Sequence, residues 1–154
     1  MPYVFVTVGS TSFDNLVKNI DNENVLLKFK SQGYDNIVYQ IGSGKYTPNV
    51  KHILPIEYFR YKPDITNLIC SAKLVICHAG VGTIMEALRA SKPVIVVPNT
   101  SLMDNHQNEL ANVLGDKRYV VNCVAENIIS VVSFDFTTRP IWKRADLSPF
   151  NSLI

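Results

Sequence analysis

The sequence predicts an α/β fold, with a Rossmann-like parallel sheet flanked by helices. Short apolar runs alternate with longer amphipathic stretches along the chain, as in strand–helix–strand units. The runs 74–77 and 94–97 are almost wholly apolar, which is typical of strands buried on both faces. The chain has 154 residues, enough for one domain with a full core and too few for two ordinary ones.

Strands are expected where β-branched and aromatic residues run together, and helices where apolar residues recur every three or four positions. In the first part of the chain we predict strand 3–8, helix 13–20, short helix 22–31, strand 36–41 and weak strand 50–54. Pro63 is predicted in the first turn of a helix that contains Leu68 and Ile69. After it we predict strand 74–77, helix 83–90, strand 94–97, a helix that begins after Asp104, runs to about residue 114 and is closed by Gly115, strand 118–122 and helix 126–132.

Residues 1–133 are therefore expected to form the folded domain. Residues 134–154 are less regular and contain Pro140, Trp142 and Pro149. In a free monomer this tail would expose apolar surface. We expect it either to pack back on the domain or to dock on a partner.

Composition excludes several classes of protein. A hydrophobic fraction of 47% and a charged fraction of 18% indicate a folded protein. The net charge is +2 and no basic block is interleaved with aromatics, so nucleic acid is not expected as a partner. The beginning of the sequence lacks a signal-peptide pattern, and no apolar run approaches a membrane span. Three cysteines without CxxC spacing predict buried thiols in a reducing compartment: Cys70, Cys77 and Cys123.

Three predicted strand-to-helix turns carry polar or small residues at the edge of the sheet where ligands of such folds bind. The first contains Gly9, Ser10, Thr11 and Ser12. Backbone N–H groups at such a turn suit a diphosphate. Plain capping of the next helix by Thr11 or Ser12 explains the same residues.

The second turn runs from His78 to Thr83 and contains Gly80 and Gly82. Two glycines one residue apart allow the backbone to approach a ligand closely. Thr83 and Glu86 have the spacing of a capping box, which would give Glu86 a purely structural role. Alternatively, the Glu86 carboxylate accepts hydrogen bonds from the ribose hydroxyls of a nucleotide.

The third turn, 99–107, is crowded with polar groups that match sugar hydroxyls, which donate and accept hydrogen bonds. Asp104 as a helix N-cap would explain only one of them. The polar members of this stretch and its first following residue are Asn99, Thr100, Ser101, Asp104, Asn105, His106, Gln107 and Asn108.

Several familiar motifs are missing from the sequence. There is no GxGxxG after the first strand and no Walker loop, which disfavours NAD enzymes and P-loop ATPases. No metal-ligand spacing and no serine nucleophile elbow is present either.

The segments 6–14, 74–88 and 92–99, followed by Asp104-Asn105-His106-Gln107, occur in one order. Together they resemble the C-terminal domain of family 28 glycosyltransferases, and most closely the cytosolic subunits of eukaryotic UDP-N-acetylglucosamine transferases of the dolichol pathway. The resemblance covers about residues 3–133. It implies one half of a GT-B enzyme, in which this half binds the UDP-sugar.

The resemblance also implies roles for individual residues. Gly9, Ser10 and Thr11 would lie against the diphosphate, and Glu86 would hold the ribose. Tyr61 and Lys62 would form a wall for uracil. The second nucleotide loop would consist of His78, Gly80, Gly82 and Thr83, and the sugar hydroxyls would be bound by Asn105, His106 and Gln107. Val81 and Cys77 depart from the residues that are common at their positions.

The family mechanism is a single inverting displacement without a protein-bound metal or other cofactor. The general base would come from the other half, so no catalytic residue is assigned in this chain. By resemblance, the partner is a membrane-anchored, acceptor-binding subunit at the cytosolic face of the endoplasmic reticulum. The acceptor would be dolichol-diphosphate-linked N-acetylglucosamine, in the second step of N-linked glycosylation.

Three alternatives stay open. One is a subunit of a bacterial-type split transferase that makes polysaccharide. Another is a non-catalytic module that binds UDP-sugar and regulates its partner. The third is a Rossmann-like binder of a different nucleotide.

Overall fold

The α/β prediction is confirmed by a computed structural model that describes residues 2–99 and 105–132, with side chains for 2–99 and 111–132. The strands of the described part are β1 (Tyr3–Thr7), β2 (Asn36–Gln40), β3 (Ile56–Phe59), β4 (Leu74–His78), β5 (Val94–Val97) and β6 (Val121–Asn122). Within these residues they form one six-stranded sheet in the order β3-β2-β1-β4-β5-β6. All neighbouring strands are parallel. The order reverses between β1 and β4, where doubly wound sheets form their binding crevice.

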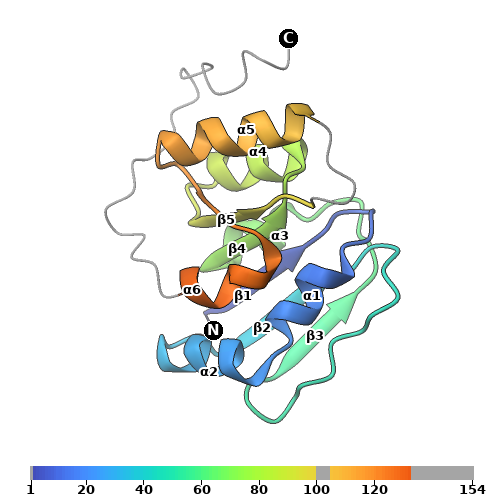
Figure 1. Cartoon of the computed structure of the whole chain (residues 1–154). Helices are drawn as coiled ribbons and strands as arrows, with labels where there is room; N and C mark the ends of the chain where they lie inside the picture. Colours follow the sequence, from blue (N-terminus) through green and yellow to red (C-terminus); the bar gives the residue numbers. More distant parts are fainter. Residues whose placement is uncertain (1, 100–104, 133–154) are drawn as a thin grey trace.

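Helices cover both faces of this sheet (Figure 1). In chain order they are α1 (Asp14–Ile20), α2 (Glu23–Ser31), α3 (Thr66–Ser71), α4 (Val81–Arg89), α5 (Asn105–Asp116), the 3₁₀ turn η1 (Ala125–Asn127) and α6 (Ile128–Val131). The core on one face contains residues of α1, α2 and α6. The core on the other face contains residues of α3, α4 and α5.

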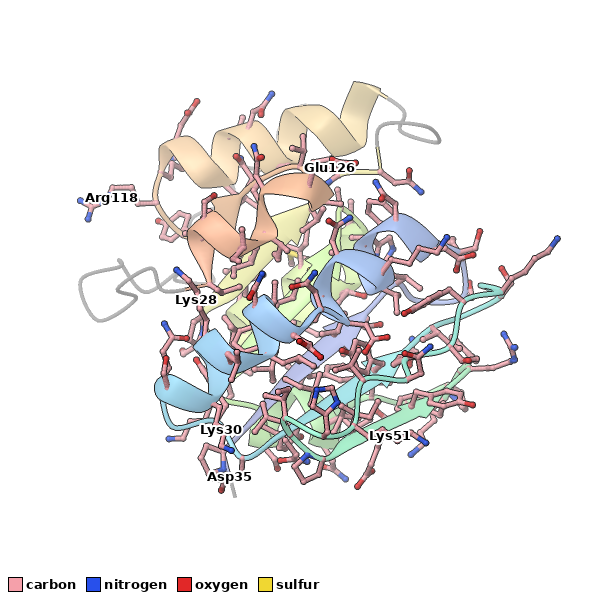
Figure 2. The ribbon with its side chains drawn as sticks, turned by 60° about the horizontal axis from the view of Figure 1, so that its bottom comes forward. Lys28, Lys30, Asp35, Lys51, Arg118 and Glu126 are labelled. Carbon is pink, nitrogen blue, oxygen red and sulfur yellow. The ribbon has the colours of Figure 1, made fainter. Side chains whose placement is uncertain are left out.

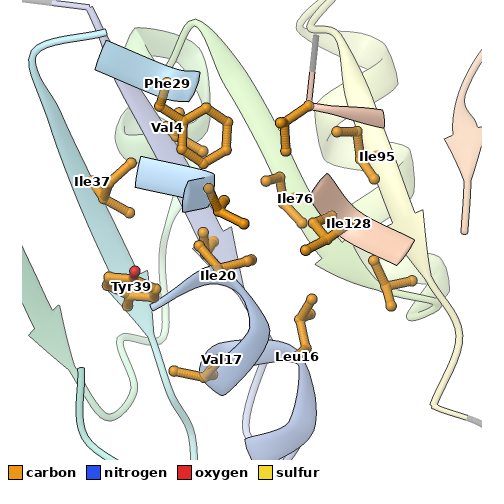
Figure 3. Packing of buried hydrophobic residues seen from close by; sticks show 14 of the residues in the cluster. Val4, Leu16, Val17, Ile20, Phe29, Ile37, Tyr39, Ile76, Ile95 and Ile128 are labelled. Atoms are coloured by element: carbon orange, nitrogen blue, oxygen red, sulfur yellow. The ribbon is translucent and has the colours of Figure 1, made fainter. Parts of the chain in front are cut away.

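The central strands supply side chains to both cores. In β1, Val4 and Val6 lie in the core beneath α1 and α2, whereas Phe5 lies in the core beneath α3 and α4. This alternation follows from the two-residue period of a strand. Figure 3 shows the first core, where Ile20 of α1 and Phe29 of α2 pack over Val4. All three side chains are fully buried, and each such burial contributes about 1.5–3 kcal/mol.

Helix α2 shows how a short amphipathic helix is fixed at the surface. The side chain of its N-cap, Asn22, accepts hydrogen bonds from the backbone N–H groups of Asn24 and Val25, at 2.9 and 3.4 Å. These bonds satisfy donors that the first turn of a helix leaves free. Lys28 and Lys30 are exposed on its outer side (Figure 2). The polar face therefore points to solvent and the apolar face to the sheet.

The predicted strand 50–54 is wrong, because the third strand of the sheet is β3, Ile56–Phe59. The apolar residues of 50–54 pack on the core as a loop, with Leu54 buried. The backbone N–H of Val50 is engaged by the carboxylate of Asp21 at 3.0 Å and not by a strand. Strand β3 is at the edge of the sheet and only half buried, so its apolar signal is weak.

Several predicted boundaries also shift. Helix α3 begins at Thr66, so Pro63 lies before it and not in its first turn; Asp64 instead accepts a hydrogen bond from the Thr66 N–H at 2.9 Å. Strand β6 is shorter than the predicted 118–122, because Arg118 has a positive φ of 66°. Helix α5 continues through Gly115 to Asp116.

Gly115 lies inside α5 and does not end it. A glycine is needed here because a side chain would clash with a neighbouring residue. A Cβ at Gly115 would lie 2.5 Å from Nδ2 of Asn122. That amide donates a hydrogen bond to the Ala111 carbonyl at 2.8 Å. The glycine therefore leaves room for Asn122 of β6 to form this hydrogen bond with α5.

The predictions for Asp104 as an N-cap and for the tail 134–154 fall outside the described residues. Within the described ranges, no helix combines the length and the hydropathy that crossing a membrane requires.

Candidate functional site

A cleft of about 310 Å³ lies at the carboxyl ends of β1, β2 and β4. Its position matches the crevice expected where the strand order reverses. The cleft brings together residues that are far apart in the sequence. Its lining consists of Gly9, Ser10, Thr11, Gln40, Tyr61, Lys62, Pro63, Ile65, His78, Gly80, Gly82, Thr83 and Glu86.

The turn after β1 has a conformation that explains its glycine. Gly9 has a φ of +65°, in the left-handed region that other residues rarely adopt. Its N–H donates to Thr7 Oγ1 at 3.0 Å, and Thr11 Oγ1 donates to the Val8 carbonyl at 2.8 Å. Capping of α1 by Thr11 or Ser12 is wrong, because its N-cap is Phe13, without a side-chain cap bond. The explanation of these residues as caps of α1 therefore fails.

The loop after β2 packs against the backbone of the turn that follows β1. A Cβ on Gly42 would lie only 1.9 Å from the Thr11 carbonyl oxygen. The adjacent Ser43 N–H donates to that same oxygen at 3.1 Å. Arg60 Nη1 donates to the carbonyls of Gly42 and Gly44 at 3.3 and 2.7 Å. This backbone-to-backbone packing holds the turn in place with few side chains.

The turn after β4 leads directly into α4, which starts two residues earlier than predicted. Its N-cap is Gly80, and no side chain caps it. Thr83 therefore lies within the first turn of the helix, and the predicted capping box with Glu86 is wrong. The first turn leaves backbone N–H groups and the positive end of the helix dipole at the cleft.

Glu86 lies one turn further along α4. Its Oε2 is buried and has no hydrogen-bond partner. A buried carboxylate oxygen without a donor costs free energy. Because Glu86 lines the cleft and caps nothing, a ligand with hydroxyl or N–H donors would satisfy this oxygen.

His78 is packed between the two turns. A Cβ on Gly9 would come 3.2 Å from its Cε1, and a Cβ on Gly80 would come 2.5 Å from its Nε2. Burial lowers the pKa of His78, and a hydrogen bond with the backbone of Thr7 opposes this effect in part. The imidazole is therefore neutral at pH 7, and it fixes the spacing between the two backbone segments.

Gly82 differs from the other glycines of the cleft. A Cβ built on it would meet no atom within 4 Å. It occupies the second position of α4, where alanine would favour the helix. Packing within the described part of the chain gives no reason for a glycine here. Close approach of a ligand to the helix start would give one.

The cleft presents two chemically different sets of groups. The turn at Gly9 and the start of α4 at Gly80 present backbone donors, which suit an anion. Gln40 and Glu86 each present a buried oxygen without a partner, which suits a group that carries donor hydrogens. A ligand that is anionic at one end and rich in hydroxyl or N–H groups at the other fits this arrangement.

Tyr61 and Lys62, predicted as a wall for a base, lie in the loop between β3 and α3 and line the cleft. The Tyr61 side chain is 56% exposed. The Lys62 ammonium lies 4.5 Å from the centre of the Phe59 ring, an arrangement that orients it.

Sequence reasoning missed three lining residues: Gln40, Pro63 and Ile65. A signal existed for Gln40, since it is a polar residue at the end of a buried strand, followed by Gly42-Ser43-Gly44. No comparable signal marked Ile65, whose helical spacing already explained it.

Of the third predicted turn, the structure describes Asn99 and the backbone of α5. Asn99 Nδ2 donates to the Ser12 carbonyl at 3.5 Å, which joins this turn to the first. Asn105, His106 and Gln107 form the first three positions of α5, on a neighbouring strand-to-helix connection. Their side chains lie outside the described part, so their role as sugar-binding residues stays a prediction.

Two further predictions concern metal and thiols. Among the described residues, no three His, Cys, Asp or Glu side chains gather into a possible metal site. All three cysteines are free, but Cys70 is exposed, so the prediction that all three are buried is wrong. It occupies an outer position of the short helix α3. Burial raises the pKa of Cys77 to about 12 and that of Cys123 to about 11.

Comparison with known proteins places this cleft in a wider context. A model of the glycosyltransferase family 28 C-terminal domain matches residues 3–147. A human protein, UDP-N-acetylglucosamine transferase subunit ALG13, is 41% identical over 125 residues. That match covers 80% of this chain but only 11% of the human protein.

Two solved structures share the fold. An NMR structure of ALG13 is 25% identical, with a TM-score of 0.61, and the match covers 80% of this chain and 78% of that one. MurG from Acinetobacter baumannii is 23% identical, with a TM-score of 0.62. That match covers 85% of this chain and 39% of MurG, so this fold corresponds to part of that larger chain.

Proposed function

This chain belongs to the family of glycosyltransferase family 28 C-terminal domains, and on that basis we propose that it binds the donor UDP-N-acetylglucosamine as one subunit of a two-subunit glycosyltransferase. The donor is inferred from relatives named UDP-N-acetylglucosamine transferase subunits. The observation that carries the proposal is the unpartnered Oε2 of Glu86, in a cleft that also presents the start of α4.

A UDP-sugar fits both sets of groups in the cleft. Its diphosphate offers acceptor oxygens and negative charge to the N–H groups at Ser10 and at the start of α4. Its ribose offers two hydroxyls, which donate to Glu86. The neutral state of His78 adds no charge, so the diphosphate is held mainly by backbone dipoles.

The same groups would act in the transfer step. An acceptor hydroxyl attacks the anomeric carbon, the bond to the diphosphate breaks, and UDP leaves with the electron pair. The backbone donors at Ser10, Gly80 and Gly82 would stabilise the negative charge that grows on the leaving diphosphate. We assign no general base to this chain; the base that takes the proton of the hydroxyl belongs to the partner in this proposal.

We further propose that the acceptor is dolichol-diphosphate-linked N-acetylglucosamine, in the second step of N-linked glycosylation. The partner would be a membrane-anchored subunit that binds this lipid at the cytosolic face of the endoplasmic reticulum. The word subunit in the names of the relatives supports a partner. The identity of the acceptor and the site of recruitment follow from the resemblance alone.

Donor binding is tested by isothermal titration of the full chain with UDP-N-acetylglucosamine. Glu86→Gln should weaken binding at least tenfold, because a charged acceptor for two hydroxyls becomes a weaker neutral one. Glu57→Gln is a matched control, since Glu57 is exposed on the edge strand β3. Equal affinity of wild type and Glu86→Gln would contradict the role of Glu86. Failure of the wild type to bind would contradict the proposed function.

A second experiment separates this proposal from its alternatives. Binding of UDP-N-acetylglucosamine, UDP-glucose, NAD and ATP is compared by thermal shift, where a bound ligand raises the midpoint. A preference for NAD or ATP would indicate another class of nucleotide-binding protein. Co-purification from the native source, followed by assay with lipid acceptors, identifies the partner. Transfer by the purified single chain would contradict the two-subunit proposal.

A further inference from the structure

Gln40 is the most deeply buried polar side chain of the cleft. It is 1% exposed, it lines the cleft, and its Oε1 has no hydrogen-bond partner. By contrast, the backbone carbonyl of Gln40 has a hydrogen-bond partner, since it accepts the Val8 N–H at 3.1 Å. A buried amide oxygen that is left unpaired destabilises the free protein, because folding removes its hydrogen bond to water. Such a cost at the floor of a cleft points to a ligand that removes it.

The direction of the Gln40 side chain follows from strand alternation. Ile37, Tyr39 and Ile41 face the core beneath α1 and α2, whereas Val38 belongs to the core beneath α3 and α4. Gln40 therefore points to the same side as Val38. Glu86 lies on α4 on that side and borders the same cleft. The two unpartnered oxygens thus lie on the same side of the sheet and border one cleft.

The surroundings of Gln40 restrict what this oxygen binds. The same cleft is also lined by the aromatic ring of Tyr61 and the apolar side chains of Pro63 and Ile65. The diphosphate of a nucleotide sugar carries no donor hydrogen at neutral pH, so it leaves Oε1 unsatisfied. A flat group with apolar faces and a polar edge fits better, because the faces lie against Tyr61 and Ile65 while the edge meets the amide.

We infer that Gln40 is a base-recognition residue whose carboxamide pairs with the imide edge of uracil. Its Oε1 accepts the N3–H of the base, and its Nε2 is available to donate to the neighbouring O4. This inference rests on the proposed function, because it takes the ligand to be a uridine nucleotide. It assigns the nucleoside end of the cleft to Gln40 and Glu86 together.

Gln40→Met tests the inference, since methionine has a similar length and no polar group. The variant should bind UDP about three- to tenfold more weakly than the wild type, as expected for one lost hydrogen bond. The free variant should unfold at the same or a higher temperature, because an unsatisfied buried amide has been removed. A merely structural glutamine would lower that temperature. Gln32→Met, at the exposed C-cap of α2, is the matched control.

The atom of UDP that Gln40 contacts is identified by comparing how strongly the wild type and Gln40→Met bind UDP and two analogues of it. N3-methyl-UDP lacks the imide donor, and 2′-deoxy-UDP lacks one ribose hydroxyl. Replacing UDP by N3-methyl-UDP should weaken binding to the wild type more than binding to Gln40→Met. Coupling to the 2′-hydroxyl instead, or equal affinity of the two proteins for UDP, would overturn the assignment. Absence of UDP binding by the wild type would instead refute the proposed function on which it rests.

Discussion

The imidazole of His78 occupies the space that a side chain at Gly80 would need, since a Cβ built at Gly80 lies 2.5 Å from His78 Nε2. Gly80 has an ordinary φ of −84°, so backbone conformation does not require a glycine. The requirement is the close approach of the β4–α4 turn to the histidine ring. The position of the start of α4 is thereby coupled to His78.

Gly80→Ala should therefore destabilise the protein by about 1–3 kcal/mol through overpacking. The measurement is the free energy of unfolding in urea. In the background of His78→Ala, which removes the ring, the same substitution should cost less than about 0.5 kcal/mol. A cost that is equal in both backgrounds would contradict the coupling.

Gly82→Ala should behave in the opposite way. The added methyl meets no atom of the described structure, and alanine favours a helix by up to about 1 kcal/mol over glycine. We expect unchanged or higher stability but at least tenfold weaker binding of UDP, because the methyl group enters the cleft.

Asn24→Ala is the matched control for Gly82→Ala, since Asn24 holds the corresponding second position of α2, outside the cleft. Thermal unfolding and titration with UDP are measured on both variants. If Gly82→Ala binds UDP as tightly as the wild type, the diphosphate does not approach the start of α4.

The parts of the fold that the sequence predicts well are those with strong, uniform burial. Residues 74–77 of β4 and all of β5 are apolar and buried, and their patterns leave no competing assignment. Strand β3 was missed because Glu57 and Tyr58 of this edge strand are exposed. The loop at Leu54 was mistaken for it, because packing beneath a loop selects the same apolar residues as a strand does.

The site residues that the sequence predicts are likewise those that leave a strong local pattern. Gly9 and Gly80 were found because turns that approach other groups closely leave glycines in the sequence. Gln40 was missed because its signal is positional and not periodic: it is a single polar residue at the end of a buried strand, before Gly42-Ser43-Gly44. The proposed capping roles of Thr11 and Thr83 failed because caps depend on the exact start of a helix, and the N-caps of α1 and α4 are Phe13 and Gly80.

Asp21 should be the main anchor of the loop that replaces the predicted strand. It is 6% exposed, and its carboxylate accepts the N–H groups of Asn49 and Val50 at 2.9 and 3.0 Å and the hydroxyl of Tyr46. Asp21→Ala should cost about 2–4 kcal/mol, because it leaves buried donors unpaired. Urea unfolding measures this loss.

Asp35→Ala provides the comparison, since Asp35 is an exposed aspartate at the surface (Figure 2), and it should cost less than about 0.5 kcal/mol. Hydrogen exchange should also become faster at the amides of Asn49 and Val50 in Asp21→Ala. Unchanged protection of these amides would show that the carboxylate does not anchor the loop.

The pH dependence of stability should report on His78. Burial lowers its pKa below the ordinary value of 6.5, so below pH 6.5 the unfolded chain binds a proton more readily than the folded one. Stability must therefore fall as the pH drops from 6.5 through the lower pKa of the folded state. His78→Asn removes this proton site, while Glu86 and Lys62 of the same cleft remain in both proteins. Between pH 7.5 and 5, the wild type should lose more stability than the variant. Parallel unfolding curves for the two proteins over that range would show that His78 is as easily protonated in the fold as in water.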